Sequence, residues 1–146
     1  MAATTRTPRE TVELLLRTTV EGSRDDIADL YAPDVVIELP FTPDGIPSEM
    51  KGRENMRARM RAAAGMFGFD AVRDVTLHET ADPEVIIVEY RIQGTVTATS
   101  APFTLSYITV TRVVDGLIVA SRDYGNPLEA AKLLPDGIPG GESKQA

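Results

Sequence analysis

The spacing of apolar residues changes from a helical period to a two-residue period near residue 67, and this change constrains the fold most. Three early segments repeat apolar residues at helical spacing: 8–21, 24–31 and 53–66. Four later segments alternate apolar and polar residues, as strands do: 70–80, 85–99, 103–114 and 117–124. We therefore expect three helices followed by an antiparallel sheet.

The remaining segments connect or close these elements. Thr7 to Glu10 form a capping box at the start of the first helix, and Ala32-Pro33 are expected to stop the second. A short strand is predicted from Val35 to Leu39, then a loop over 40–51, which holds three prolines. Residues 127–134 are expected to form a short closing helix.

The longest alternating segment suggests that the sheet is curved. Gly94 interrupts it midway, and a glycine inside a long strand commonly marks a bulge or bend. Helices followed by a curled sheet predict an α+β fold, a cone-shaped barrel with three N-terminal helices on a strongly curved, mixed or antiparallel sheet around one small-molecule pocket. A chain of 146 residues fits one domain, which we place at 7–135 between flexible ends at 1–6 and 136–146.

Composition argues against several classes of function. The net charge of −7 would repel nucleic acid, and the chain has no cysteine for disulfides or thiolate metal sites. No metal-binding spacing, phosphate loop or dinucleotide motif is present, so we expect neither metal nor cofactor. No apolar run is long enough to span a membrane, and we expect a cytoplasmic protein.

Four stretches match a known family: IADLYAPDVVIELPF, MKGRENMRARM, HETADPEVIIVEYRIQG and DGLIVASRDYGNPLEAAKLL. On these, the chain resembles SnoaL-like proteins of the ketosteroid-isomerase (nuclear-transport-factor-2-like) superfamily. It is most similar to the phenazine-biosynthesis A/B group, which has a comparable ETxDP before the long strand and R-[ED]-aromatic-x-N-P after the last. The resemblance implies the cone fold and a homodimer that packs through the outer face of the sheet. It does not fix the reaction, because this fold supports several chemistries.

Asp123 is the first candidate catalytic residue. It alternates with small or apolar residues on one face of the last predicted strand: Leu117, Val119 and Ser121. A carboxyl in such a hollow has a raised pKa, which suits a general acid or base near neutral pH. The resemblance points to the same position, where the phenazine group carries a glutamate acid/base. The alternative is structural: Asp123 could pair with Arg112 or Arg122, or cap the Asn-Pro turn.

Two further residues could take part in catalysis. Glu38 is a second carboxylate near the loop, although strand alternation places it opposite Val35 and Ile37, so that it could equally face solvent or a second subunit. Tyr107 could stabilise an oxyanion through its hydroxyl, or it could simply pack in the core.

Other residues are candidates for binding the substrate. Arg59 stands about where the phenazine group carries a pocket histidine and could bind a carboxylate, although a solvated helix face is the alternative. The remaining expected lining residues are Phe41, Met56, Met60, Phe103 and Asn126. Asn126 can also form a turn with Pro127, and His78, the only histidine, is expected at the surface.

Two departures from the superfamily narrow the chemistry. Leu39 stands where the classical isomerase carries its aspartate base, and the phenazine group's pocket histidine is missing. The first hypothesis is a cofactor-free isomerase, cyclase or dehydratase that acts on a small, largely apolar metabolite, in secondary metabolism. A non-catalytic protein that binds a small ligand is the second hypothesis, and an epoxide hydrolase is the third.

Overall fold

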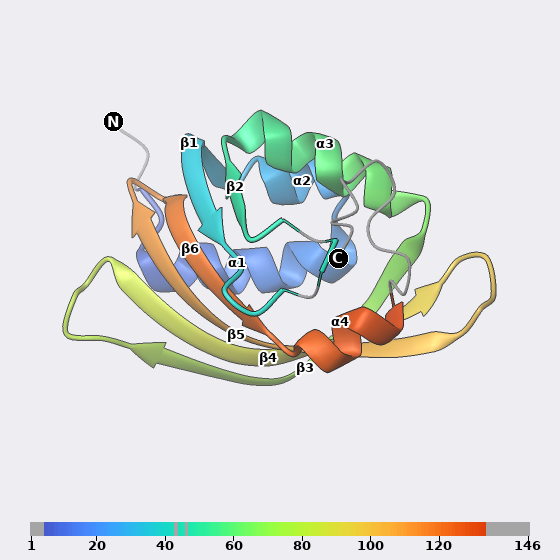
Figure 1. The fold of residues 1–146 in the computed structure, drawn as a ribbon. Coiled ribbons are helices and arrows are strands. Elements are labelled where there is room, and N and C mark those ends of the chain that lie inside the picture. Colours follow the sequence, from blue (N-terminus) through green and yellow to red (C-terminus); the bar gives the residue numbers. More distant parts are fainter. Residues whose placement is uncertain (1–4, 43, 46, 134–146) are drawn as a thin grey trace.

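The computed structural model describes residues 5–42, 44–45 and 47–133. Ten elements follow one another along the chain (Figure 1): α1 Pro8–Glu21, α2 Arg24–Ala28, β1 Tyr31–Glu38, β2 Glu49–Lys51, α3 Arg53–Ala64, β3 Phe67–Glu79, β4 Val85–Val96, β5 Pro102–Val114, β6 Leu117–Gly125 and α4 Pro127–Leu133. The expected order of helices and strands is therefore confirmed, except that β2 was not expected.

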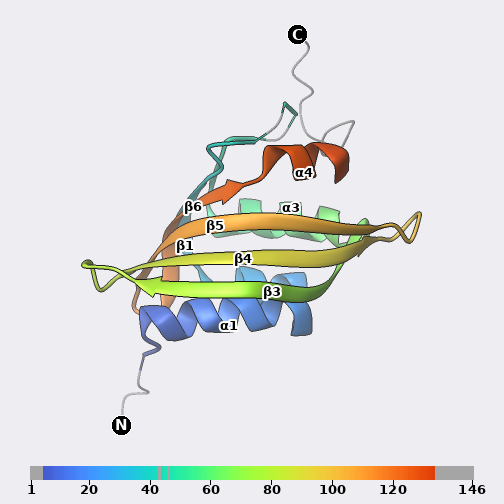
Figure 2. The same cartoon turned by 90° about the horizontal axis from the view of Figure 1, so that it is seen from below.

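One six-stranded sheet organises the molecule, with strand order β2-β1-β6-β5-β4-β3. All neighbours pair antiparallel except β1 and β6, which are parallel, so the sheet is mixed. Helices α1, α2 and α3 lie on one side of the curved sheet (Figure 1), and the opposite side shows the strands uncovered (Figure 2). This is the expected α+β cone. No helix in the described part of the chain is long and apolar enough to cross a membrane.

Local hydrogen bonds explain where the first two helices begin. The Glu10 amide donates to Thr7 Oγ1 at 3.1 Å, and the Thr7 amide donates to the Glu10 carboxylate at 2.9 Å. Ser23 and Asp26 repeat this capping box at the start of α2. Each box satisfies amide groups that a helix leaves unpaired at its start.

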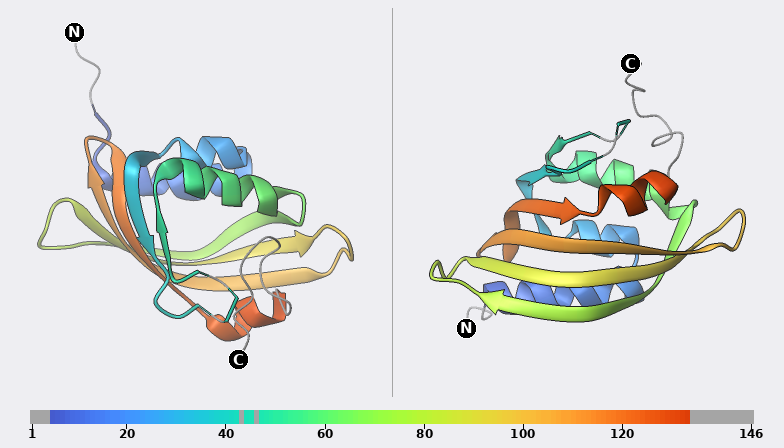
Figure 3. Two further views of the ribbon diagram at one scale, coloured as in Figure 1. Left: turned by 45° about the horizontal axis from the view of Figure 1, so that its top comes forward. Right: turned by 60° about the horizontal axis from the view of Figure 1, so that its bottom comes forward.

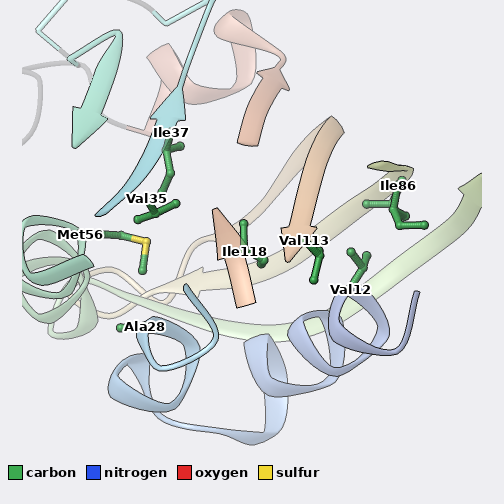
Figure 4. Packing of buried hydrophobic residues seen from close by; sticks show 9 residues of the cluster. Val12, Ala28, Val35, Ile37, Met56, Ile86, Val113 and Ile118 are labelled. Atoms are coloured by element: carbon green, nitrogen blue, oxygen red, sulfur yellow. The ribbon is translucent and has the colours of Figure 1, made fainter. Parts of the chain in front are cut away.

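The hydrophobic core lies between the helices and the inner face of the sheet (Figure 4). Val12 from α1, Ala28 from α2 and Met56 from α3 pack with buried strand residues that include Val35 and Ile118. Burying one valine, isoleucine or methionine side chain contributes about 1.5–3 kcal/mol. The core therefore fixes the helices on the inner face and makes it the interior of the cone.

Three predictions near the first strand are wrong. The second helix was expected to reach residue 31, but α2 ends at Ala28 and Tyr31 already pairs with Ile118 of β6. Pro33 does not stop a helix; it lies inside β1, where the register with β6 shifts, and a strand tolerates proline where the hydrogen-bond ladder is interrupted. Glu49–Lys51, predicted to be loop, form the short edge strand β2.

Gly94 does mark an irregularity, but the bulge lies on the neighbouring strand. The β3–β4 register shifts between Phe69, which pairs with Gly94, and Ala71. A Cβ atom at Gly94 would collide with the Gly68 carbonyl oxygen and the Phe103 ring. Glycine is therefore required there for close approach of the backbone.

The predicted flexible ends lie mostly outside the described residues, which include only Thr5 and Arg6 of them. The Arg6 guanidinium donates to the Gly116 carbonyl oxygen at 2.8 Å, so this part of the N-terminal segment contacts the β5–β6 turn. The predicted closing helix 127–134 is α4, which ends at Leu133; residue 134 lies outside the described residues.

Candidate functional site

Asp123 lies on the inner face of β6, as predicted, but the residues that share this face with it are partly different from those predicted. A register shift between Arg112 and Val113 makes Val119 the extra residue of a bulge, because Ile118 pairs with Val113 and Ala120 with Arg112. Ile118 is therefore the fully buried residue on this face. The prediction that Leu117 and Val119 share the face of Asp123 is wrong. Ser121 and Asp123 keep their predicted inward positions.

Asp123 is half-buried at the cavity described below and has no cationic partner among the described residues. Burial raises its pKa to about 6, and a hydrogen bond from Ser121 Oγ to Oδ1, at 2.5 Å, partly opposes the rise. Arg112 binds Asp82 and Glu84 instead. Arg122 is exposed and donates to the Tyr124 hydroxyl, so the structure does not contain the predicted alternative of an aspartate–arginine pair.

Three tyrosines from different strands lie close enough to this carboxyl to be affected by its charge: Tyr31 on β1, Tyr90 on β4 and Tyr107 on β5. Burial raises the pKa of all three hydroxyls, and the charge of Asp123 raises each further. The pKa of Tyr107 is about 12. The Tyr90 and Tyr107 rings stack with centroids 5.6 Å apart. At neutral pH all three hydroxyls therefore keep their protons and can donate hydrogen bonds.

Sequence reasoning missed two of these tyrosines. The predicted helix 24–31 includes Tyr31 at its end, and the predicted strand 85–99 includes Tyr90 only as one of its alternating apolar positions. Tyr90 alternates with Ile86 and Val88, which both face the core, and this phase was the signal that could have identified it. No comparable signal existed for Tyr31, because its position depends on pairing with β6, almost 90 residues away.

A cavity of about 100 Å³ opens beside Asp123. Its walls come from the segment that follows β1, from β5 and β6, and from α4, and they include Leu39, Phe41, Leu105, Tyr107, Asp123 and Ala130. Among the described lining residues there is no lysine, arginine or histidine. A Cβ atom at Gly125 would come within 2.8 Å of Tyr107 Cε1, so the glycine lets the tyrosine ring lie next to β6. The cavity is therefore mostly apolar, with one carboxyl group.

The structure brings four of the predicted site residues to this cavity: Asp123, Tyr107, Phe41 and Asn126. Phe41 is 58% exposed and contacts the Tyr124 ring at 5.5 Å between centroids. The Asn126 side chain also accepts a hydrogen bond from the Leu128 amide at 3.0 Å. Asn126 therefore lines the cavity and also forms the predicted turn.

The other predicted site residues lie elsewhere. Glu38 is exposed and borders a groove on the outer face, and Arg59 is exposed on α3. Met56 is buried in the core, and Met60 packs against it. Phe103 packs edge-on against Phe67 and Phe69.

A larger, open hollow of about 510 Å³ extends over the outer side of the sheet and adjoins the Asp123 cavity, with which it shares Phe41, Tyr107 and Asn126. Its acidic side chains are already paired: Glu89 with His78 at 2.7 Å, and Asp74 with Arg91 at 3.6 Å. Asp123 is not among its described lining residues. We therefore place the candidate site in the smaller cavity, where no cation among the described residues pairs with the Asp123 carboxyl and burial raises its pKa. Within the described ranges no three potential ligand side chains are grouped to hold a metal.

Comparison with known proteins gives the family. Residues 12–121 match the SnoaL-like domain. The PhzA/B-like protein PA3332 of Pseudomonas aeruginosa, itself uncharacterised, is 36% identical over 121 residues, which cover 82% of this chain and 84% of the relative.

Two solved structures show the same fold. A Bacillus subtilis protein described provisionally as an isomerase has a TM-score of 0.82 and 26% identity, covering 90% of this chain and 96% of that one. A Pseudomonas putida protein described provisionally as a polyketide cyclase has a TM-score of 0.74 and 15% identity, covering 88% and 98%. The family match covers most of the chain, the PhzA/B-like relative is similar in sequence, and the solved structures share the cone fold. The protein therefore belongs to the SnoaL-like family.

Proposed function

We propose that the protein is an enzyme that isomerises, cyclises or dehydrates a small, uncharged, largely apolar metabolite by general acid–base catalysis at Asp123. One observation carries the proposal: the Asp123 carboxyl lines an apolar cavity beside Tyr107, with no cation among the described lining residues. A pKa of about 6 leaves the carboxyl mostly ionised at pH 7, yet close enough to neutrality to take up and return a proton.

Asp123 and Tyr107 have different roles in the proposed reaction. The Asp123 carboxylate removes a proton from a carbon next to a carbonyl group. The Tyr107 hydroxyl donates a hydrogen bond to the carbonyl oxygen as negative charge develops on it, which lowers the barrier. Asp123 then returns the proton at another atom of the substrate. An uncharged substrate fits best, because an anion would meet the carboxylate and the described lining residues offer no counter-charge.

The family relationships support this type of reaction. The structures described provisionally as an isomerase and as a polyketide cyclase share the fold. The PhzA/B-like relative and the cyclase also support a role in secondary metabolism. The alternative of an epoxide hydrolase has less support, because Asp123 is the only acidic residue among the described residues that line the cavity.

Proton exchange tests the proposal without knowledge of the natural substrate. In D₂O, the wild-type protein should exchange the acidic C–H protons of small cyclic ketones such as 2-cyclohexen-1-one faster than buffer does, as followed by ¹H NMR. Tyr107→Phe should slow this exchange by about 10²–10³-fold, because the oxyanion loses a donor. Saturable binding of these ketones without exchange would instead favour the second hypothesis, a non-catalytic binding protein.

We also propose that two copies pair through the outer face of the sheet. Ile108 is 45% exposed there, and the half-buried side chains of Ile87, Val110 and Tyr124 lie on the same face. Sedimentation analysis should give twice the chain mass of 15.8 kDa, and Ile108→Glu should give the single-chain mass with an unchanged circular dichroism spectrum. A wild-type monomer at micromolar concentration would refute the dimer.

A further inference from the structure

The cavity beside Asp123 is too small to enclose a metabolite. Its volume is about 100 Å³. An engineered protein cavity of about 150 Å³ holds a single benzene molecule, and pockets for small ligands usually measure about 300–1,000 Å³. If the proposed function is carried out in an enclosed site beside Asp123, at least one wall must move to make room for the substrate.

The walls differ in how firmly they are attached. Leu105, Tyr107 and Asp123 lie on β5 and β6, whose side-by-side pairing runs from Tyr107 to Val114. Ala130 and Pro127 belong to α4, a seven-residue helix with no buried residue. Leu128 in the same helix is 73% exposed. Little apolar burial holds α4 in place, so it is the wall that opens at least cost.

One side chain fastens α4 to the sheet. Strand β6 ends at Gly125, and α4 follows it beside the first half of β5 (Figure 3), so the Ser106 amide has no strand partner on that side. The Glu129 carboxylate accepts a hydrogen bond from this amide at 2.7 Å and from Ser106 Oγ at 3.2 Å. The Asn126 amide adds a bond to the Ser106 carbonyl oxygen at 3.1 Å, which anchors the base of the helix.

We propose that α4 is a lid over the Asp123 cavity, that it pivots at Asn126, and that the bonds from Ser106 to Glu129 are the latch that holds it closed. Ligand entry then requires Glu129 to release the strand. Because a hydrogen bond to an ionised acceptor is stronger than one between neutral groups, the latch keeps the open state rare. Glu129 is thus a positioning residue that acts through Ser106 and the helix.

A single introduced cysteine can report on the lid, because the chain has none of its own. Leu105→Cys places a thiol in the cavity wall. Its labelling by iodoacetamide, followed by intact mass, should be slow in the otherwise wild-type chain. Adding Glu129→Ala should speed it about 10- to 100-fold, as the loss of a charge-assisted hydrogen bond predicts. Glu129→Gln keeps an acceptor for the Ser106 amide and should give a smaller increase.

Two controls separate lid opening from other effects. Lys132→Ala changes an exposed residue of the same helix and should leave the labelling rate unchanged. Val113→Cys, buried at the far end of β5, reports on global unfolding and should stay protected when Glu129 is replaced. The lid proposal is wrong if Leu105→Cys is labelled at the same rate with Glu129 present and with Glu129→Ala. It is also wrong if both proteins are labelled as fast as a surface thiol. No turnover is measured, so this result is independent of whether Asp123 is catalytic.

Discussion

Asp123→Asn should lower the rate of substrate turnover, and of ketone proton exchange, by about 10²–10⁴-fold, because general acid–base assistance has that magnitude. The amide has nearly the volume of the carboxyl and can still accept the hydrogen bond from Ser121, so the cavity should keep its shape. Ligand affinity should therefore change much less than the rate does. Steady-state kinetics and a binding titration on the same variant measure the two effects separately.

Asp34→Asn is the matched control, since Asp34 is an exposed aspartate on β1. It should retain the wild-type rate. If Asp123→Asn binds ligand and turns it over at the wild-type rate, Asp123 only lines the pocket and the proposed mechanism is wrong. If Asp123→Asn instead fails to fold, the carboxyl has a structural role that its contacts do not reveal.

The same substitution should stabilise the protein above pH 6. Burial raises the folded-state pKa of Asp123 to about 6, above its ordinary value of 3.8. Between these two pH values the folded protein holds a proton that the unfolded chain has released. The free energy of unfolding therefore falls as pH rises across this interval and stays lower above it. The ionised carboxyl costs the folded state about 2–3 kcal/mol, a cost that asparagine avoids.

Thermal melts at several pH values measure this effect. At pH 8, Asp123→Asn should melt roughly 5–10 °C higher than the wild-type protein, whereas near pH 4 the two should converge. Asp34→Asn should follow the wild-type protein throughout. A variant that melts lower at pH 8 would show that the ionised carboxyl has a favourable partner, which contradicts the cavity described above.

Much of the fold could be predicted from local patterns. The capping box at Thr7 and Glu10 and the change of apolar spacing near residue 67 depend on neighbours in sequence, and the helix at Pro8–Glu21 matches its prediction. The errors around Tyr31 and β2 have a non-local cause. These strands exist because β1 pairs with β6 and β2, and no local pattern encodes that pairing.

The candidate site was only partly predictable. Asp123 could be identified from alternation along its strand, although the bulge at Val119 made the predicted phase wrong at Leu117. The approach of Tyr31 to Asp123 depends on strand order, and the covering of the cavity by α4 depends on where β6 ends. Distances between strands cannot be read from a single sequence, so these features required the structure.

The proposed mechanism requires that the Asp123 carboxyl lies in the cavity without a cationic partner among the described residues and titrates near neutral pH. Carbon-13 NMR of the protein labelled at aspartate carboxyl carbons measures this directly, with Asp123→Asn identifying the resonance. The structure predicts a titration midpoint near pH 6 for this one aspartate. A midpoint at or below its ordinary value of 3.8 would mean that the carboxylate is solvated or paired, and would contradict the proposed mechanism.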